Sequence, residues 1–173
     1  MGRPRDDDFA LAIAAQLRAG AQVPDARFDR LLPPALRPHA AMHFTPVAVA
    51  ARAAAWLTAG GAAEVADLGA GAGKFCLVGA ATTAARFTGL EVRSGLVQVA
   101  RDLARRLGLD RAQFVQADLR RAPLGRYQAF YVYDPFSEAE AGEDERLDAW
   151  VPTEDRAADV AALLGRLEEA PAG

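Results

Sequence analysis

Three glycines at alternate positions, Gly69, Gly71 and Gly73, form the part of the sequence best suited to bind a ligand. The mostly apolar residues 65–68 before them predict a buried strand, and the apolar residues 75–78 after them predict a buried helix. Such a turn lacks the Cβ atoms that would block a ligand and permits positive φ. It also leaves backbone N–H groups and a helix N-terminus to face an anionic group. We therefore expect a nucleotide-like ligand at this strand-to-helix turn.

The spacing of the glycines separates the known classes of nucleotide-binding turn. A P-loop would require glycine at Leu68 and a hydroxyl residue at Phe75, so this class is excluded. The dinucleotide fingerprint would need its third glycine at Lys74 or Cys76, and it therefore fits poorly. A loop that binds no ligand stays open as the alternative, because glycine-rich turns also occur without one.

The pattern Asp67-x-Gly69-x-Gly71-x-Gly73 resembles the first motif of class I S-adenosylmethionine-dependent methyltransferases. This resemblance implies a Rossmann-like methyltransferase fold and S-adenosylmethionine as the cofactor. It also implies that main-chain amides of the turn meet the methionine carboxylate of the cofactor. Asp67 would then fix the loop or accept a hydrogen bond from the ammonium group.

Acidic residues also follow the next two predicted strands, at the carboxyl edge where parallel sheets bind ligands. Glu91 ends a strand over residues 86–91 and can accept hydrogen bonds from both ribose hydroxyls. Asp118 and Leu119 follow a strand over residues 113–116, where Asp118 is placed to accept a hydrogen bond from the adenine amino group. The alternatives are an exposed glutamate after a strand and a solvated loop aspartate.

The fourth predicted strand, residues 129–133, is followed by Asp134, Pro135 and Phe136. This stretch resembles the Asp/Asn-Pro-Pro-aromatic motif of amino-group methyltransferases, with one proline missing. The resemblance implies that Asp134 and the adjacent carbonyl hold the target nitrogen, while Phe136 flanks the substrate. Asp134 stands where similar uncharacterised bacterial methyltransferase-domain proteins have Asn. These three residues are the candidate catalytic residues, and a simple turn is the alternative.

The stretch His43-Phe44-Thr45-Pro46, here called the entry segment, precedes a predicted helix that ends near Gly60. Thr45 is expected to be the N-cap of this helix and Pro46 its first residue. The stretch also resembles the Thr-Pro entry segment of bacterial and archaeal protein-lysine methyltransferases. That resemblance implies that Phe44 and Thr45 close over the cofactor.

Alternating strands and helices predict an α/β fold in three parts. Residues 1–42 form an N-terminal extension of accessory helices, with a charged, mobile start and a first helix from Phe9. Residues 43–136 form the S-adenosylmethionine-binding core, and residues 137–173 an acidic linker with a C-terminal helix. The strand over residues 129–133 is the last that the sequence predicts. Either the chain is truncated after its fourth strand, or a helix covers the open sheet edge.

Composition narrows the possible partners. With 173 residues, 51% of them hydrophobic, and a net charge of −3, the chain predicts one ordinary domain that does not mainly hold duplex DNA. Cys76 is the sole cysteine, so we expect no internal disulfide, no metal site and a cytoplasmic location. The apolar runs are too short to span a bilayer. Several arginines, from Arg101 to Arg121, could still form a local basic surface.

These patterns together predict an S-adenosylmethionine-dependent methyltransferase that acts on an amine of a protein or small molecule. The sulfonium already activates the methyl group, so the protein mainly has to align the acceptor with it. One alternative is a module that binds S-adenosylmethionine without transferring the methyl group. Another, with poorer glycine spacing, is an NAD-binding protein.

Overall fold

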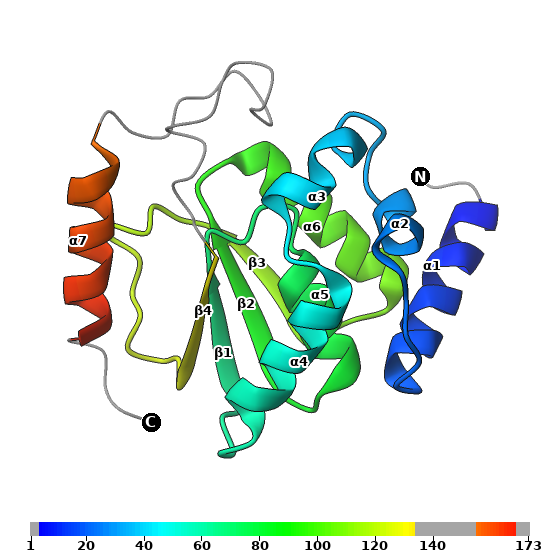
Figure 1. The fold of residues 1–173 in the computed structure, drawn as a ribbon, viewed down its shortest axis with the longest axis horizontal. Coiled ribbons are helices and arrows are strands. Elements are labelled where there is room, and N and C mark those ends of the chain that lie inside the picture. The colour runs from blue at the N-terminus through cyan, green and yellow to red at the C-terminus, as the bar shows by residue number, and fades with distance from the viewer. Residues whose placement is uncertain (1–3, 134–154, 169–173) are drawn as a thin grey trace.

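The computed structural model describes residues 4–133 and 155–168, in which helices flank a parallel sheet (Figure 1). The sheet has the order β3-β2-β1-β4, and every pairing in it is parallel. This arrangement confirms the predicted α/β, Rossmann-like fold. The strands are β1 (Glu64–Leu68), β2 (Arg86–Glu91), β3 (Ala112–Gln116) and β4 (Ala129–Val132).

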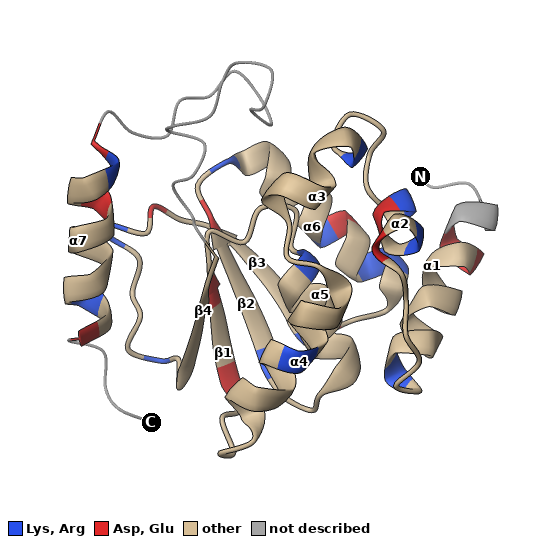
Figure 2. Cartoon of the chain, viewed as in Figure 1, with Lys and Arg blue, Asp and Glu red and all other residues tan. Residues whose placement is uncertain are grey.

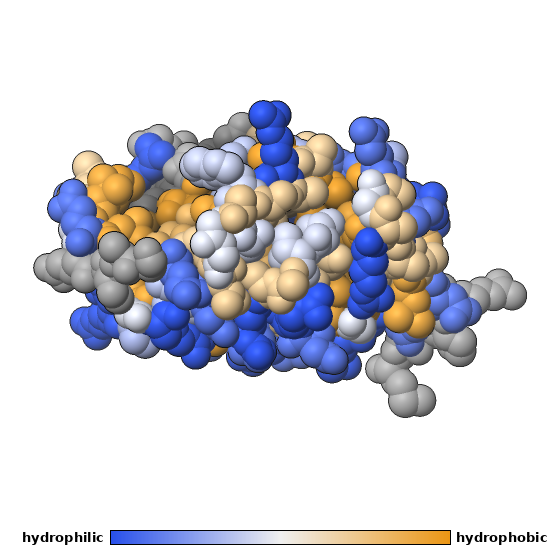
Figure 3. Space-filling model, turned by 90° about the horizontal axis from the view of Figure 1, so that it is seen from below, coloured by the Kyte–Doolittle hydropathy of each residue, from blue (hydrophilic) through white to orange (hydrophobic). Residues whose placement is uncertain are grey.

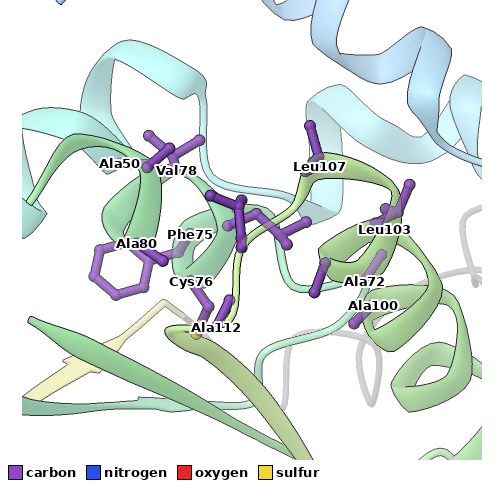
Figure 4. Packing of buried hydrophobic residues seen from close by; sticks show 14 of the residues in the cluster. Ala50, Ala72, Phe75, Cys76, Val78, Ala80, Ala100, Leu103, Leu107 and Ala112 are labelled. Atoms are coloured by element: carbon purple, nitrogen blue, oxygen red, sulfur yellow. The ribbon is translucent and has the colours of Figure 1, made fainter. Parts of the chain in front are cut away.

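The larger hydrophobic core lies between one face of the sheet and a layer of longer helices. Figure 4 shows side chains of three of these helices, together with Ala112 of β3, converging in this core. The helix over residues 94–107 carries its buried residues on one stripe. Its C-cap, Gly108, adopts a φ of 62°. The layer comprises α1 (Pro4–Arg18), α4 (Val47–Thr58), α5 (Lys74–Thr82) and α6 (Ser94–Leu107).

A smaller core covers the other face of the sheet. There α7 (Arg156–Glu168) places Leu163 against apolar residues of the segment 117–128, which connects β3 to β4. Arg166 of α7 donates hydrogen bonds to the carbonyls of Leu119 and Ala122. Figure 1 shows α7 and α5 on opposite sides of the sheet. The predicted C-terminal helix therefore helps to cover the sheet.

Short helices connect α1 to the entry segment. They are α2 (Asp25–Phe28), η1 (Asp29–Leu31), η2 (Arg37–His39) and α3 (Ala40–His43). The chain before Pro33 thus forms an α-helical turn followed by a 3-10 turn. The first helix, α1, begins at Pro4, five residues before the predicted start at Phe9.

The start of α4 differs from the prediction. Pro46 is the N-cap and Val47 the first helical residue, so Thr45 is not the cap. The N–H of Val47 instead donates to Oδ1 of Asp25, at 2.8 Å. The Thr45 hydroxyl lies 3.1 Å from the hydroxyl of Tyr131 in β4. A distant aspartate has therefore replaced the local cap, which frees Thr45 to contact the sheet.

Most arginines of the candidate basic surface are bonded to other protein groups. Arg101 donates to the carbonyl of Phe114, and Arg105 pairs with Asp102. Figure 2 shows acidic residues interrupting the basic ones on α2 and α6. Seen from below, the surface is a mosaic of hydrophilic and hydrophobic patches (Figure 3). Within residues 4–133 and 155–168, no helix combines the length and apolar character needed to cross a bilayer.

Candidate active site

The glycine turn joins β1 to α5, and its three glycines have φ values of 87°, 54° and 82°. These are left-handed conformations that glycine adopts without strain. However, the amides of Gly69 and Ala70 donate to the carbonyl of Leu90, and that of Gly73 donates to the carbonyl of Ala70. The expectation that the glycine amides face a ligand is therefore wrong for these residues, because β2 and the turn itself already use them.

Close packing gives a second reason for glycine in the turn. A Cβ on Gly71 would lie 3.0 Å from the ring of Phe44, so the entry segment rests directly on the turn. A Cβ on Gly73 would lie 2.5 Å from the ring of Phe114 and 2.9 Å from Cβ of Ala100. The turn is thus enclosed by the entry segment on one side and by β3 and α6 on the other.

Glu91 ends β2 and is turned toward the glycine turn, with 4% of its surface exposed. Its Oε2 accepts the N–H of Gly71 at 2.9 Å. Its Oε1 accepts the backbone N–H and the Nε–H of Arg93, at 3.0 and 3.2 Å. Because Oε2 has one partner among these contacts, it retains a lone pair for a ligand hydroxyl. The structure therefore places Glu91 beside the turn, as the ribose prediction requires.

Asp67 lies in β1 just before the turn and is 4% exposed. Burial, together with the nearby negative charge of Glu91, raises its pKa to about 7, although the hydrogen bond from the Cys76 thiol opposes this shift. The Sγ–H of Cys76 donates to Oδ2 at 3.7 Å. Burial and the charge of Asp67 also raise the pKa of Cys76, so this cysteine stays a thiol. A cation placed beside Asp67 would stabilise its ionised form.

Replacing Asp67 by Asn should flatten the pH dependence of stability. A carboxyl whose pKa rises from 3.8 to about 7 on folding binds a proton more tightly in the folded state. Its contribution to stability is full below pH about 4 and is lost above pH about 7, a change of roughly 2–4 kcal/mol. We therefore expect the free energy of unfolding in urea to fall less between pH 5 and pH 8 for Asp67→Asn than for wild type. The exposed Asp110→Asn serves as the control, and parallel curves for wild type and Asp67→Asn would contradict the assignment.

A narrow cleft opens beside Asp67 at the carboxyl ends of β1 and β4. It brings together four of the predicted cofactor residues with the first residues of α5 and the exposed ring of Tyr133. The Thr45–Tyr131 contact closes one wall, where the Tyr131 ring also stacks on Phe75 at 3.8 Å. The lining residues are His43, Phe44, Thr45, Asp67, Gly69, Ala70, Lys74, Phe75 and Tyr133.

The remaining predicted site residues lie at the edges of this region or outside the described residues. Asp118 follows β3 and binds Arg120 through both carboxylate oxygens, which lowers the pKa of Asp118. Leu119 beside it is buried in the smaller core. The candidate catalytic residues 134–136 lie outside the described residues, so their role stays a prediction.

Sequence reasoning missed an ion-pair cluster at the start of α5. Nζ of Lys74 lies 2.6 Å from Oδ1 of Asp25 and 2.7 Å from Oδ1 of Asp29, and the Lys74 side chain is 2% exposed. Lys74 begins the apolar stretch that predicts a buried helix. A buried ammonium needs acidic partners, so this position alone was a signal that acidic residues must approach from elsewhere.

Comparison with protein families assigns just over half of the chain. Residues 65–153 match the model of a family described as a methyltransferase domain. This region begins in β1 and includes the glycine turn, Glu91 and Asp118. Comparison with curated proteins finds no match.

Solved structures with a similar fold are methyltransferases of different kinds. The mitomycin 7-O-methyltransferase MmcR is 23% identical, with a TM-score of 0.53, over 91% of this chain and 39% of that chain. The glycopeptide N-methyltransferase MtfA with sinefungin is 23% identical, with a TM-score of 0.50, over 71% and 45%. An RNA methyltransferase from Salinibacter ruber with S-adenosyl-L-homocysteine is 31% identical, with a TM-score of 0.48, over 55% and 63%. The chain thus spans less than two thirds of each.

Proposed function

Because this chain belongs to the methyltransferase domain family, we propose that it binds S-adenosylmethionine at the carboxyl edge of the sheet and transfers the methyl group to an amine. The prediction of a class I S-adenosylmethionine-dependent methyltransferase is confirmed at the level of the family. The similarity to protein-lysine enzymes rests on the entry segment and stays a prediction, as does the chemical class of the acceptor.

One observation carries this proposal: three carboxylates lie at the carboxyl ends of three adjacent strands. Asp67 belongs to β1, Glu91 ends β2, and Asp118 follows β3, while the spatial order of these strands is β1, β2, β3. S-adenosylmethionine offers three groups of donors in a row, namely its ammonium, its ribose hydroxyls and its adenine amino group. An elongated ligand across the strand ends would therefore meet an acceptor at each step.

The described residues would bind and orient the cofactor. Bound S-adenosylmethionine would supply a methyl group that is already activated by its sulfonium. Asp67 would accept a hydrogen bond from the ammonium, and Oε2 of Glu91 would accept one from a ribose hydroxyl. Phe44 and Thr45 would cover the cofactor from the side of the entry segment, which already lies against Gly71. Positioning of this kind can lower a barrier by several kcal/mol.

The proposed amine acceptor would bind beyond the end of β4. Tyr133 is 48% exposed there, lines the cleft and directly precedes Asp134. An alkyl amine with a pKa of about 10.4 must lose its proton before it attacks the methyl group. In this proposal Asp134 and the adjacent carbonyl orient the nitrogen, and Phe136 flanks the acceptor. Their identity as catalytic residues depends on the resemblance to amino-group methyltransferases.

Two measurements test the proposal in order. Calorimetric titration of the purified chain should show saturable binding of S-adenosylhomocysteine and no binding of NAD. Incubation with methyl-labelled S-adenosylmethionine and cell extract should then give a labelled product, whose acid stability and digestion show whether a protein amine carries the label. Denatured chain provides the background in both measurements.

The alternatives predict different outcomes. Binding of NAD without a response to S-adenosylhomocysteine would refute the proposal in favour of a dinucleotide-binding protein. Confirmed binding of S-adenosylhomocysteine without labelled product would instead favour a module that binds the cofactor but does not transfer the methyl group. A labelled hydroxyl or carboxyl would overturn the amine assignment alone.

A further inference from the structure

Lys74 is the single lysine in the sequence, and it lies directly after the glycine turn. Every other basic side chain that counts toward the 20 lysines and arginines is an arginine. Lys74 is also almost completely buried, and its ammonium contacts Asp25 and Asp29 from the N-terminal extension. The compact ammonium donates to both carboxylates at once. Nothing in the proposed methyl transfer requires this cation.

One carboxylate oxygen connects the cluster to the entry segment. Oδ1 of Asp25 accepts hydrogen bonds from Nζ of Lys74, at 2.6 Å, and from the N–H of Val47, at 2.8 Å. Lys74 begins α5 and Val47 begins α4, so this oxygen fixes the starts of two helices relative to each other. Although burial opposes the shift, the hydrogen bonds from Lys74 and Val47 and the charge of Lys74 lower the pKa of Asp25. Asp29 also accepts a hydrogen bond from Lys74, at 2.7 Å, but within the described residues its carboxylate forms no hydrogen bond with α4.

The segment before Val47 lies against the predicted cofactor site. The Phe44 ring touches the position where a Cβ on Gly71 would be, and the Thr45 hydroxyl contacts Tyr131. Phe44 and Thr45 both line the cleft beside Asp67. A ligand in the cleft would therefore lie against Phe44 and Thr45. The position of these residues depends on the start of α4, which Asp25 holds.

We propose that Lys74 and Asp25 form a latch that holds the entry segment closed over the cofactor and so controls how long the cofactor stays bound. This inference rests on the proposed function, because it assumes that the cleft binds S-adenosylmethionine or its product. Asp25 is a positioning residue here, since it acts through Val47 and the entry segment, whereas Lys74 also lines the cleft. The latch connects the N-terminal extension to the start of α5. In this proposal, breaking the bond between Lys74 and Asp25 would release the cofactor without unfolding the sheet.

Asp25→Ala and Asp29→Ala form a matched pair that tests the latch. Each variant removes one carboxylate from Lys74, but Asp25→Ala also removes the acceptor of the Val47 N–H. We expect Asp25→Ala to raise the dissociation rate of S-adenosylhomocysteine by about tenfold or more, because a charge-assisted hydrogen bond is lost. Asp29→Ala should change this rate less than about threefold. Hydrogen exchange of residues 44–50 in the ligand-free chain should also rise more in Asp25→Ala than in Asp29→Ala.

Each outcome of this experiment decides one question. Equal dissociation rates and equal exchange for the two variants would overturn the latch. Faster exchange in Asp25→Ala with an unchanged dissociation rate would overturn its link to the cofactor. If wild type binds no S-adenosylhomocysteine, the proposed function is refuted, and so is the effect of the latch on cofactor release. The difference in exchange between the two variants would still show whether Asp25 holds the entry segment. Lys74→Met, assayed by exchange where it folds, should resemble Asp25→Ala.

Discussion

Replacing Glu91 by Ala is expected to weaken the binding of S-adenosylhomocysteine by roughly 10- to 100-fold. The substitution removes the acceptor of the Gly71 N–H and leaves this amide unpaired beside the turn, which costs about 1–3 kcal/mol. It also removes the carboxylate proposed to bind the ribose, and a hydrogen bond to a charged group contributes about 1.5–3 kcal/mol. The loss of the ribose contact corresponds to roughly 10- to 100-fold in affinity. The unpaired amide lowers the stability of the free and the bound chain alike.

Glu91→Gln and Glu64→Ala separate these contributions. Gln keeps the size of the side chain and one acceptor oxygen, so we expect its affinity to fall by about tenfold. Glu64 begins β1 at the opposite end of the sheet and pairs with Arg86 near the surface, so Glu64→Ala should bind S-adenosylhomocysteine like wild type. Calorimetry gives the affinities, and circular dichroism shows that each variant is folded. Binding by Glu91→Ala within about threefold of wild type would exclude Glu91 from the site.

The sheet and the place of the site could be predicted from the sequence because they follow from local patterns. The alternation of strand-like and helix-like segments after residue 64 predicted the parallel sheet and its flanking helices. Glu91 was found because ligands of parallel sheets bind at strand ends. In each case the signal lies within a few residues of the element that it describes.

The errors arose where distant residues replaced a local interaction. Thr45 has the residue type and position of an N-cap, but Asp25, which lies 22 residues from Val47, accepts the amide that a cap would have served. The glycine amides were expected to bind a ligand, but the Leu90 carbonyl and Glu91 use those of Gly69 and Gly71. Neither partner can be recognised without the pairing of β1 and β2 or the packing of the N-terminal extension.

The same limit applies to the conformation of the turn. Alternating glycines predict positive φ and room for a ligand, and the structure confirms the positive φ values of Gly69, Gly71 and Gly73. The sequence gives no sign that Phe114 in β3 presses against the last of these glycines, because that contact depends on how β2 and β3 pair. Packing against Phe114 is therefore a second reason, besides access of a ligand, for a residue without Cβ at position 73.

Gly73→Ala is accordingly expected to lower the free energy of unfolding by roughly 2–5 kcal/mol. The added methyl group would lie 2.5 Å from two atoms of the Phe114 ring and 2.9 Å from Cβ of Ala100. Overpacking of this kind costs about 1–3 kcal/mol. The φ of 82° adds a further cost of roughly 1–2 kcal/mol for any residue with a Cβ. Urea denaturation measures the total.

Gly61→Ala separates the two costs, because Gly61 has a φ of 91° and no atom within 4 Å of an added Cβ. This control should lose about 1–2 kcal/mol from backbone strain alone. If Gly73→Ala is no less stable than Gly61→Ala, the predicted clash does not occur. If the clash does occur, the double variant Gly73→Ala/Phe114→Leu should be more stable than the sum of the single changes predicts, because the smaller side chain makes room for the methyl group.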